Sequence, residues 1–141
     1  MELVTKRRTI SENDIIAYTQ MTGYANENLF GDMVYLMETM KHPRRLAPGL
    51  LTASIADALI VGSGVIEGHA VALVGMNNMV AKHPVYAGDS IHVEIVVTHK
   101  KESQSKPDRG VVVTHQKVIN QNGIVVLEYD VSRMLLKKAA L

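Results

Sequence analysis

The stretch from residue 82 to residue 89 constrains the fold of this 141-residue chain more than any other. Its sequence is Lys-His-Pro-Val-Tyr-Ala-Gly-Asp, and it lies between two apolar runs that are rich in β-branched residues. Pro84 cannot donate a hydrogen bond to a β ladder, and Gly88 can take a positive φ angle. We therefore predict a turn between two strands, called the 82–89 turn below.

A helix is predicted ahead of this turn. Residues 50–61 are apolar on every face of a helix, with Gly49 before them and Gly62-Ser63-Gly64 after them, which predicts a core helix buried all round. Beyond it the hydrophobic period changes to two residues, which predicts strands. The strand-like runs cover residues 70–76, 90–100, 110–119 and 124–135, with an Asn-Gly hairpin signal at residues 120–123. The pattern predicts a single α+β domain over residues 1–141, with an antiparallel sheet covering the central helix.

The N-terminal part of the chain predicts shorter helices. Residues 11–14, Ser-Glu-Asn-Asp, come close to a capping box, so we expect a helix that starts there and ends at Gly23. Ile10 can pack against Ile15 as a hydrophobic staple. Residues 24–33 are expected to form a loop, and residues 34–40 a short helix that stops before Pro43.

Composition restricts the class of function. The net charge of +1 disfavours nucleic-acid binding, which usually needs a concentrated basic face. The chain has no cysteine, which excludes disulfides and thiolate chemistry. The longest apolar stretch, residues 46–61, is too short to span a bilayer, and the N-terminal basic residues precede no apolar signal-peptide core. We expect a cytoplasmic protein with no membrane or nucleic-acid partner.

The histidines predict no metal site. No pair of them has the i, i+4 spacing of helical metal ligands, and they are scattered along the chain: His42, His69, His83, His92, His99 and His115. We expect His83, in the 82–89 turn, at the surface rather than in catalysis.

Several segments resemble the MaoC-like hydratase and dehydratase family, which has the hot-dog fold. The similar segments follow one another in order along nearly the whole chain: residues 10–15, 22–26, 47–54 (Ala-Pro-Gly-Leu-Leu-Thr-Ala-Ser), 84–89 (Pro-Val-Tyr-Ala-Gly-Asp), 103–110 and 120–123. The resemblance implies one hot-dog domain, a curved antiparallel sheet wrapped around a long central helix. It also implies lyase chemistry on acyl thioesters in fatty acid metabolism, with coenzyme A or an acyl-carrier pantetheine as part of the substrate and no other cofactor.

The chain departs from the family at the usual catalytic dyad. Active hydratases have Gly-Asp-x-Asn-Pro-x-His in the loop after the first helix, where Asp and His act on water and on the α-carbon of the substrate. This chain has Gly-Tyr-Ala-Asn-Glu-Asn-Leu at residues 23–29, so that Tyr24 and Leu29 replace the dyad. The His-Gly that opens the central helix in many members is Pro48-Gly49 here.

Two residues of the central helix are candidates for the remaining chemistry. Gly49 opens the helix, and its unpaired N–H can polarise a thioester carbonyl, unless it is a plain turn glycine. Asp57 interrupts the apolar helix eight residues later, on a face that Gly49 can share. Ile55-Ala56-Asp57 resembles the Leu-Ala-Asp at the catalytic carboxylate of phenylacetyl-CoA-type thioesterases. The alternative is a structural Asp57 that is hydrogen-bonded across a subunit interface.

The loop after the first helix holds three further candidates. Glu27 can serve as a general base if the loop folds over the thioester, or it can be a solvated carboxylate. Asn26 matches a family asparagine that orders this loop. Tyr24 can donate to a carbonyl, or fill the space of the missing Asp; we favour the second role.

Lys82, Lys106 and Arg109 are candidate ligands of the coenzyme A phosphates, and the alternative is a solvated basic rim. Hot-dog protomers have an exposed sheet edge and a half-built groove. The resemblance therefore implies a homodimer or a higher homo-oligomer with its site at the interface.

Three functions remain open. The first is an acyl-CoA or acyl-carrier hydratase or dehydratase whose activity has diverged or been lost. The second is a hot-dog thioesterase that uses Asp57 or Glu27. The third is a non-catalytic acyl-CoA-binding or partner subunit.

Overall fold

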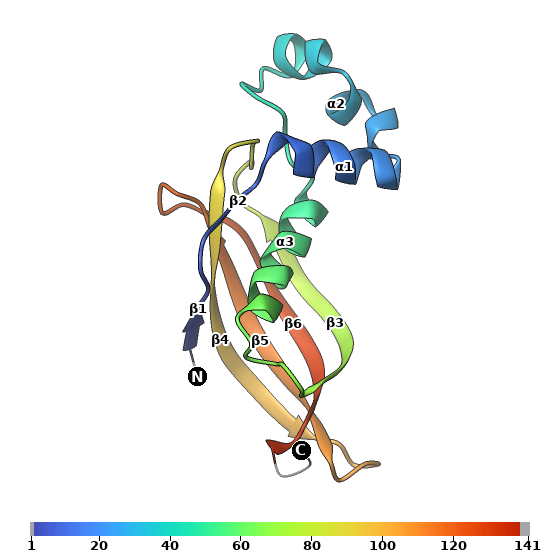
Figure 1. The fold of residues 1–141 in the computed structure, drawn as a ribbon, viewed down its shortest axis with the longest axis vertical. Coiled ribbons are helices and arrows are strands. Elements are labelled where there is room, and N and C mark those ends of the chain that lie inside the picture. Colours follow the sequence, from blue (N-terminus) through green and yellow to red (C-terminus); the bar gives the residue numbers. More distant parts are fainter. Residues whose placement is uncertain (1, 139–141) are drawn as a thin grey trace.

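The computed structural model of the protein describes residues 2–138. One antiparallel sheet curls around one long helix, with two shorter helices above the start of that helix (Figure 1). The strands of the sheet run in the spatial order β1-β4-β5-β6-β3, and β2 pairs separately with β4. Their bounds are β1 (Glu2–Val4), β2 (Arg8–Thr9), β3 (Ala70–Ala81), β4 (Ser90–Glu102), β5 (Arg109–Ile119) and β6 (Val125–Leu136). The expected α+β arrangement is therefore present.

The core lies between the sheet and helix α3 (Gly49–Gly62). Inward-facing residues of α3 such as Leu51, Ile55 and Ala56 are nearly or fully buried. They pack against alternate residues of β4 and β6, including Val93 and Tyr129, because every second side chain of a strand faces the same side of the sheet. The change from a helical to a strand period in the sequence thus corresponds to the boundary between these two layers.

The prediction that the central helix is buried all round is wrong for the protomer. Leu50 and Val61 of α3 are 52% and 50% exposed, and Ser54 and Ala58 between them are exposed as well. These four residues recur at helical spacing and form one open stripe, which we call the open stripe of α3. The sheet ends at β3 and covers only the opposite face of the helix, so the apolar pattern exceeds what one chain can bury.

Strand β3 is the free edge of the sheet on the same side. It is longer than the sequence predicted, and every residue in it except Gly75 is exposed. Its exposed apolar residues are Val71, Leu73, Val74, Met76, Met79 and Val80. A long apolar edge strand of this kind is a template for pairing with another strand.

The N-terminal helices start as the sequence predicts and then differ from it. Helix α1 (Glu12–Thr22) has a complete capping box, since Ser11 Oγ accepts from the N–H of Asp14 at 3.0 Å while Asp14 Oδ2 accepts from the N–H of Ser11 at 2.9 Å. Gly23, with φ of 87°, ends it, and the stapling residues Ile10 and Ile15 are fully buried.

The expected loop over residues 24–33 is instead mostly helical. It holds the 3-10 turn η1 (Tyr24–Asn26) and the short helix α2 (Asn28–Gly31), followed by the π-helical turn η2 (Tyr35–Thr39). Stacked aromatic rings stabilise this unit: the ring centroid of Tyr24 lies 5.7 Å from that of Tyr18 and 5.6 Å from that of Phe30. Pattern reading missed it because each helical turn is too short to show a period.

Candidate functional site

The 82–89 turn is fastened to the chain that enters α3. The N–H of Ala47 donates to the carbonyl of Val85 at 2.8 Å, and the N–H of Ala87 donates to the carbonyl of Arg45 at 2.9 Å. Between them Leu46 and Tyr86 form an isolated antiparallel bridge. Segments that lie some forty residues apart in sequence are therefore side by side at the N-terminus of α3.

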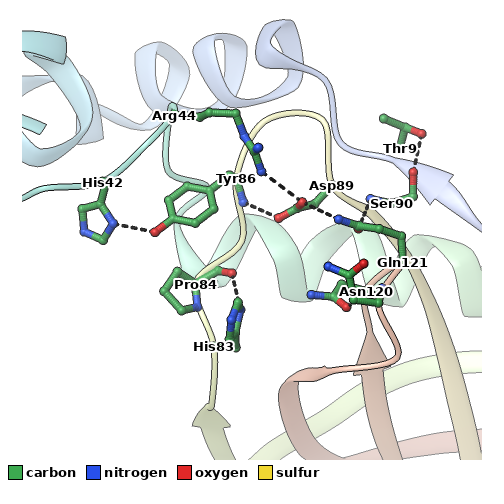
Figure 2. A network of polar contacts seen from close by, with 11 residues as sticks. Thr9, His42, Arg44, His83, Pro84, Tyr86, Asp89, Ser90, Asn120 and Gln121 are labelled. Carbon is green, nitrogen blue, oxygen red and sulfur yellow. Dashed lines mark hydrogen bonds and ion pairs between the residues drawn. The ribbon is translucent and has the colours of Figure 1, made fainter. Parts of the chain in front are cut away.

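Asp89 organises the turn (Figure 2). Its side chain is almost fully buried, and Oδ2 accepts from the N–H of Tyr86 at 2.8 Å. Oδ1 accepts from Gln121 Nε2 at 2.9 Å and from Arg44 Nη2 at 3.3 Å. One carboxylate thus joins the turn to the β5–β6 hairpin and to the segment before α3.

A cavity of about 320 Å³ lies where these segments meet. Gly49 and Thr52 of α3 line one side of it, and the ends of β3 and β6 line another. The polar or titratable side chains in its wall are Thr52, His42, Lys82 and His83. Most of its other lining residues are aliphatic, as in many small-molecule sites. We call it the Gly49 cavity.

The first turn of α3 has backbone N–H groups without acceptors, and one of them belongs to Gly49 in the wall of this cavity. Pro48 precedes the helix and makes no side-chain cap, and the N–H groups of Leu51 and Thr52 donate back to its carbonyl at 3.0 and 3.2 Å. Within the part of the chain that the structure describes, nothing accepts from the N–H of Gly49 or of Leu50. The partial positive charge of a helix N-terminus adds to these donors. The site predicted at Gly49 therefore has the donors that a carbonyl oxygen needs.

The titratable side chains of the cavity differ in their partners. Lys82 Nζ pairs with the carboxylate of Glu128 on β6, and this contact, followed by the contact with His115, lowers the pKa of Glu128. His42 Nδ1 lies 2.7 Å from Tyr86 Oη. His83 Nδ1 lies 2.8 Å from the carbonyl oxygen of Pro84, which can only accept, so Nδ1 carries a proton, and in the neutral ring the lone pair is on Nε2. No carboxylate among residues 2–138 lines this cavity.

The three loop candidates lie elsewhere. Tyr24, Asn26 and Glu27 line a separate surface hollow of about 410 Å³ beside α1 and α2. This hollow shares no lining residue with the Gly49 cavity, so the structure does not bring these residues to Gly49. Tyr24 is held in the aromatic stack described above. Its assigned role as a filler of the lost dyad position stays a prediction.

Asp57 also lies away from the Gly49 cavity. It is about 12 Å further along α3 by helical rise and pairs with Arg133 of β6. The Arg133 side chain is 10% exposed, and burial lowers its pKa. A buried guanidinium needs a carboxylate partner, so the pair fits the structural alternative for Asp57, although it forms within one chain rather than across an interface.

The candidate phosphate ligands lie at opposite ends of the protomer. Only Lys82 reaches the Gly49 cavity. Lys106 lies in the β4–β5 turn and Arg109 is the first residue of β5, at the end of the sheet far from α1 (Figure 1). Arg109 is already paired with Asp108, through Nε–Oδ1 and Nη2–Oδ2 distances of 2.8 and 3.1 Å, and this hydrogen bonding lowers the pKa of Asp108.

Sequence comparison identifies the family. The model of the MaoC-like domain matches residues 1–121. The chain belongs to the MaoC-like domain family. No curated protein is similar enough in sequence to count as a match.

Several solved structures share the fold. The MaoC-like dehydratase from Rhodospirillum rubrum is 24% identical with a TM-score of 0.74, over 98% of this chain and 92% of that one. The (R)-hydratase from A. caviae is 18% identical with a TM-score of 0.73, over 97% and 95%. A double-hotdog protein from Mycobacterium tuberculosis is 17% identical with a TM-score of 0.84, over 100% of this chain and 43% of that one. The expected hot-dog fold is therefore confirmed.

Sequence reasoning missed three polar residues of the site: Thr52, His42 and Asp89. His83 is exposed, as expected, and yet lines the Gly49 cavity. The available signal was the 82–89 turn itself, whose flanking strands had to end near the start of the central helix. His42 was not named as a site residue, because nothing in a local pattern shows that it meets Tyr86.

No helix within residues 2–138 is long and apolar enough to cross a bilayer. In the same range no three His, Asp or Glu side chains are grouped so that they could hold a metal ion.

Proposed function

We propose that this MaoC-like protein is an acyl-thioester hydratase or dehydratase that binds the thioester carbonyl at the N-terminus of α3. The observation that carries this proposal is the Gly49 cavity, whose wall includes the first residue of a 14-residue helix, with an N–H that has no acceptor within residues 2–138. The family match and the fold shared with a dehydratase and an (R)-hydratase support the same reaction class. Coenzyme A or a carrier pantetheine would belong to the substrate.

The chemistry required is stabilisation of a negative oxygen. Water adds to an enoyl thioester, or leaves a hydroxyacyl thioester, through a state in which charge develops on the thioester oxygen. One preorganised donor at such an oxygen is worth about 3 kcal/mol in the transition state. Aliphatic walls raise this value, because they exclude water and lower the local dielectric constant.

Gly49→Pro tests the donor directly. Proline is favoured at the first residue of a helix and removes only the N–H there, and the extended Pro48 (ψ of 143°) suits a following proline. Gly49→Ala is the matched control, because it keeps the N–H and its Cβ would meet no atom within 4 Å. With crotonyl-CoA, we expect kcat of Gly49→Pro to fall roughly 100-fold or more, and that of Gly49→Ala to change far less. Equal rates for the two variants would contradict the proposal.

The same assay separates the other functions. Loss of enoyl absorbance supports a hydratase, release of free thiol from saturated acyl-CoAs supports a thioesterase, and binding with neither supports a non-catalytic subunit. No observation favours the thioesterase, since neither Asp57 nor Glu27 lines the cavity at Gly49.

We further propose a homodimer formed along β3. The chain exposes 8177 Å², whereas a compact 15.5 kDa monomer exposes roughly 7200 Å². The excess is close to the roughly 800 Å² that each partner buries in an interface of standard size. The apolar edge of β3 and the open stripe of α3 supply a suitable surface.

A two-fold axis through the middle of β3 would pair this strand antiparallel with its copy. One end of each protomer would then lie beside the opposite end of its partner. The turn carrying Lys106 and Arg109 would then approach the copy's Gly49 cavity, where cations suit coenzyme A phosphates. Size-exclusion chromatography with light scattering tests the assembly. We expect a dimer for the wild type and dissociation for Leu73→Lys, whose side chain is exposed in the protomer. A stable wild-type monomer would refute it.

A further inference from the structure

The catalytic dyad of the family has no counterpart at its usual place. Tyr24 and Leu29 stand at those positions, and neither lines the Gly49 cavity. Hydration still needs a group that takes a proton from water and returns one to the α-carbon. The candidates that this chain itself supplies are the side chains in the wall of the cavity.

Thr52 lies in that wall, and its hydroxyl oxygen is buried. Its residue is 2% exposed, and among residues 2–138 its Oγ1 has no hydrogen-bond partner. Burial of a hydroxyl without a partner is unfavourable, so a hydroxyl of this kind next to a cavity is a candidate donor to a ligand bound there. Thr52 lies one helical turn after Gly49 and lines the same cavity.

His83 is the best-placed proton carrier. Lys82 is paired with Glu128, and His42 is hydrogen-bonded to Tyr86, whose N–H donates to Asp89 within the 82–89 turn. The bond from His83 Nδ1 to the carbonyl of Pro84 selects, for the neutral ring, the tautomer with its lone pair on Nε2. Figure 2 places His83 beside Pro84, at the edge of the turn that lies against α3.

We propose that His83 is the general acid–base of the Gly49 cavity and that the Thr52 hydroxyl is a second donor to the substrate's carbonyl oxygen. This assignment rests on the proposed hydratase function. His83 Nε2 takes a proton from water as the water oxygen bonds to the β-carbon of the enoyl thioester. The electron pair of the double bond moves to the carbonyl oxygen, which Thr52 Oγ–H and the Gly49 N–H hold. The proton on Nε2 then passes to the α-carbon, and the carbonyl reforms. Dehydration is the reverse sequence.

Thr52→Val tests the second donor, because valine has the same shape without the hydroxyl. We expect its urea midpoint to equal or exceed that of the wild type, while kcat/KM for crotonyl-CoA falls roughly tenfold or more. Thr19→Val is the matched control, since Thr19 is equally buried but donates to the carbonyl of Ile15 at 2.9 Å. It should keep full activity. An unchanged kcat/KM in Thr52→Val would overturn the donor role.

His83→Ala tests the proton carrier. We expect kcat to fall by about 100-fold or more with little change in KM, and free imidazole to restore part of the rate. His92→Ala is the control, because His92 lies on β4, away from the cavity. Full activity in His83→Ala, or a loss that imidazole does not restore, would overturn the assignment of His83. If the wild type hydrates crotonyl-CoA in the same assay, the proposed hydratase function still stands. A wild type that turns over no enoyl-CoA would instead refute the proposed function, and this assignment with it.

Discussion

Removal of the Asp89 carboxylate should destabilise the whole protein. In Asp89→Ala the N–H of Tyr86 and the amide of Gln121 lose an ionised acceptor at 2.8 and 2.9 Å. Bonds of this kind contribute about 1.5–3 kcal/mol each when buried. The third donor, Arg44, is 53% exposed and contributes at most about 1 kcal/mol. Because water can reach part of the vacated space, we expect the free energy of unfolding to fall by about 3 kcal/mol.

Urea unfolding followed by circular dichroism measures this loss, with all proteins at one concentration so that dimerisation does not confound the comparison. Asp89→Asn should lose about 2 kcal/mol, since its NH₂ group must face one of the present donors. Glu67→Ala is the control, because Glu67 is exposed and makes no side-chain hydrogen bond within residues 2–138. A loss below about 0.5 kcal/mol in Asp89→Ala would refute the view that this carboxylate holds the turn.

Three further predictions concern the sheet and α3. The hydrogen bond to Asp130, and to a smaller extent the one to Glu128, raises the pKa of His115 above 6.5. The contribution of protonated His115 to the stability of the fold is therefore fully present below pH 6.5 and is lost as the pH rises through the raised pKa. Urea titrations at several pH values should show that this loss, of at most about 1 kcal/mol, is absent in His115→Gln. Burial raises the pKa of Tyr129 to about 12, and its hydroxyl has no hydrogen-bond partner within the described residues. Tyr129→Phe should therefore raise the free energy of unfolding by about 1 kcal/mol. A lower free energy of unfolding in this variant would mean that the hydroxyl is hydrogen-bonded in solution. Asp57→Ala leaves a buried arginine unpaired and should cost about 2 kcal/mol in urea without slowing turnover, whereas the opposite pattern would restore Asp57 as a catalytic candidate.

The fold was predictable because its signals are local. The change of hydrophobic period, the capping box before α1 and the 82–89 turn each lie within a few residues of sequence. They predicted the order and type of the main elements, although β3 continues to Ala81 rather than ending at residue 76. The open stripe of α3 was not predictable, since an apolar face looks the same whether its own sheet or a second chain covers it.

The site was less predictable because its contacts are long-range. Helical spacing allowed Gly49 and Asp57 to share a groove, but Arg133, 76 residues away, pairs with Asp57 instead. Nothing in the sequence near His83 shows that its ring lies in the wall of the cavity that Gly49 lines. Side chains that meet only through the sheet register leave no local period to detect.

The contacts of Asp89 in the 82–89 turn also have a consequence for the order of folding. Its backbone bonds to Ile10, while its carboxylate reaches Gln121, so residues from both halves of the chain must be in place before the substrate pocket exists. Contacts between residues that are far apart in the sequence, such as Ile10 and Asp89, form slowly during folding, compared with the local contacts of a helix. After dilution from denaturant, helical signal should therefore return well before turnover does. Regained activity then reports the final step of assembly rather than collapse.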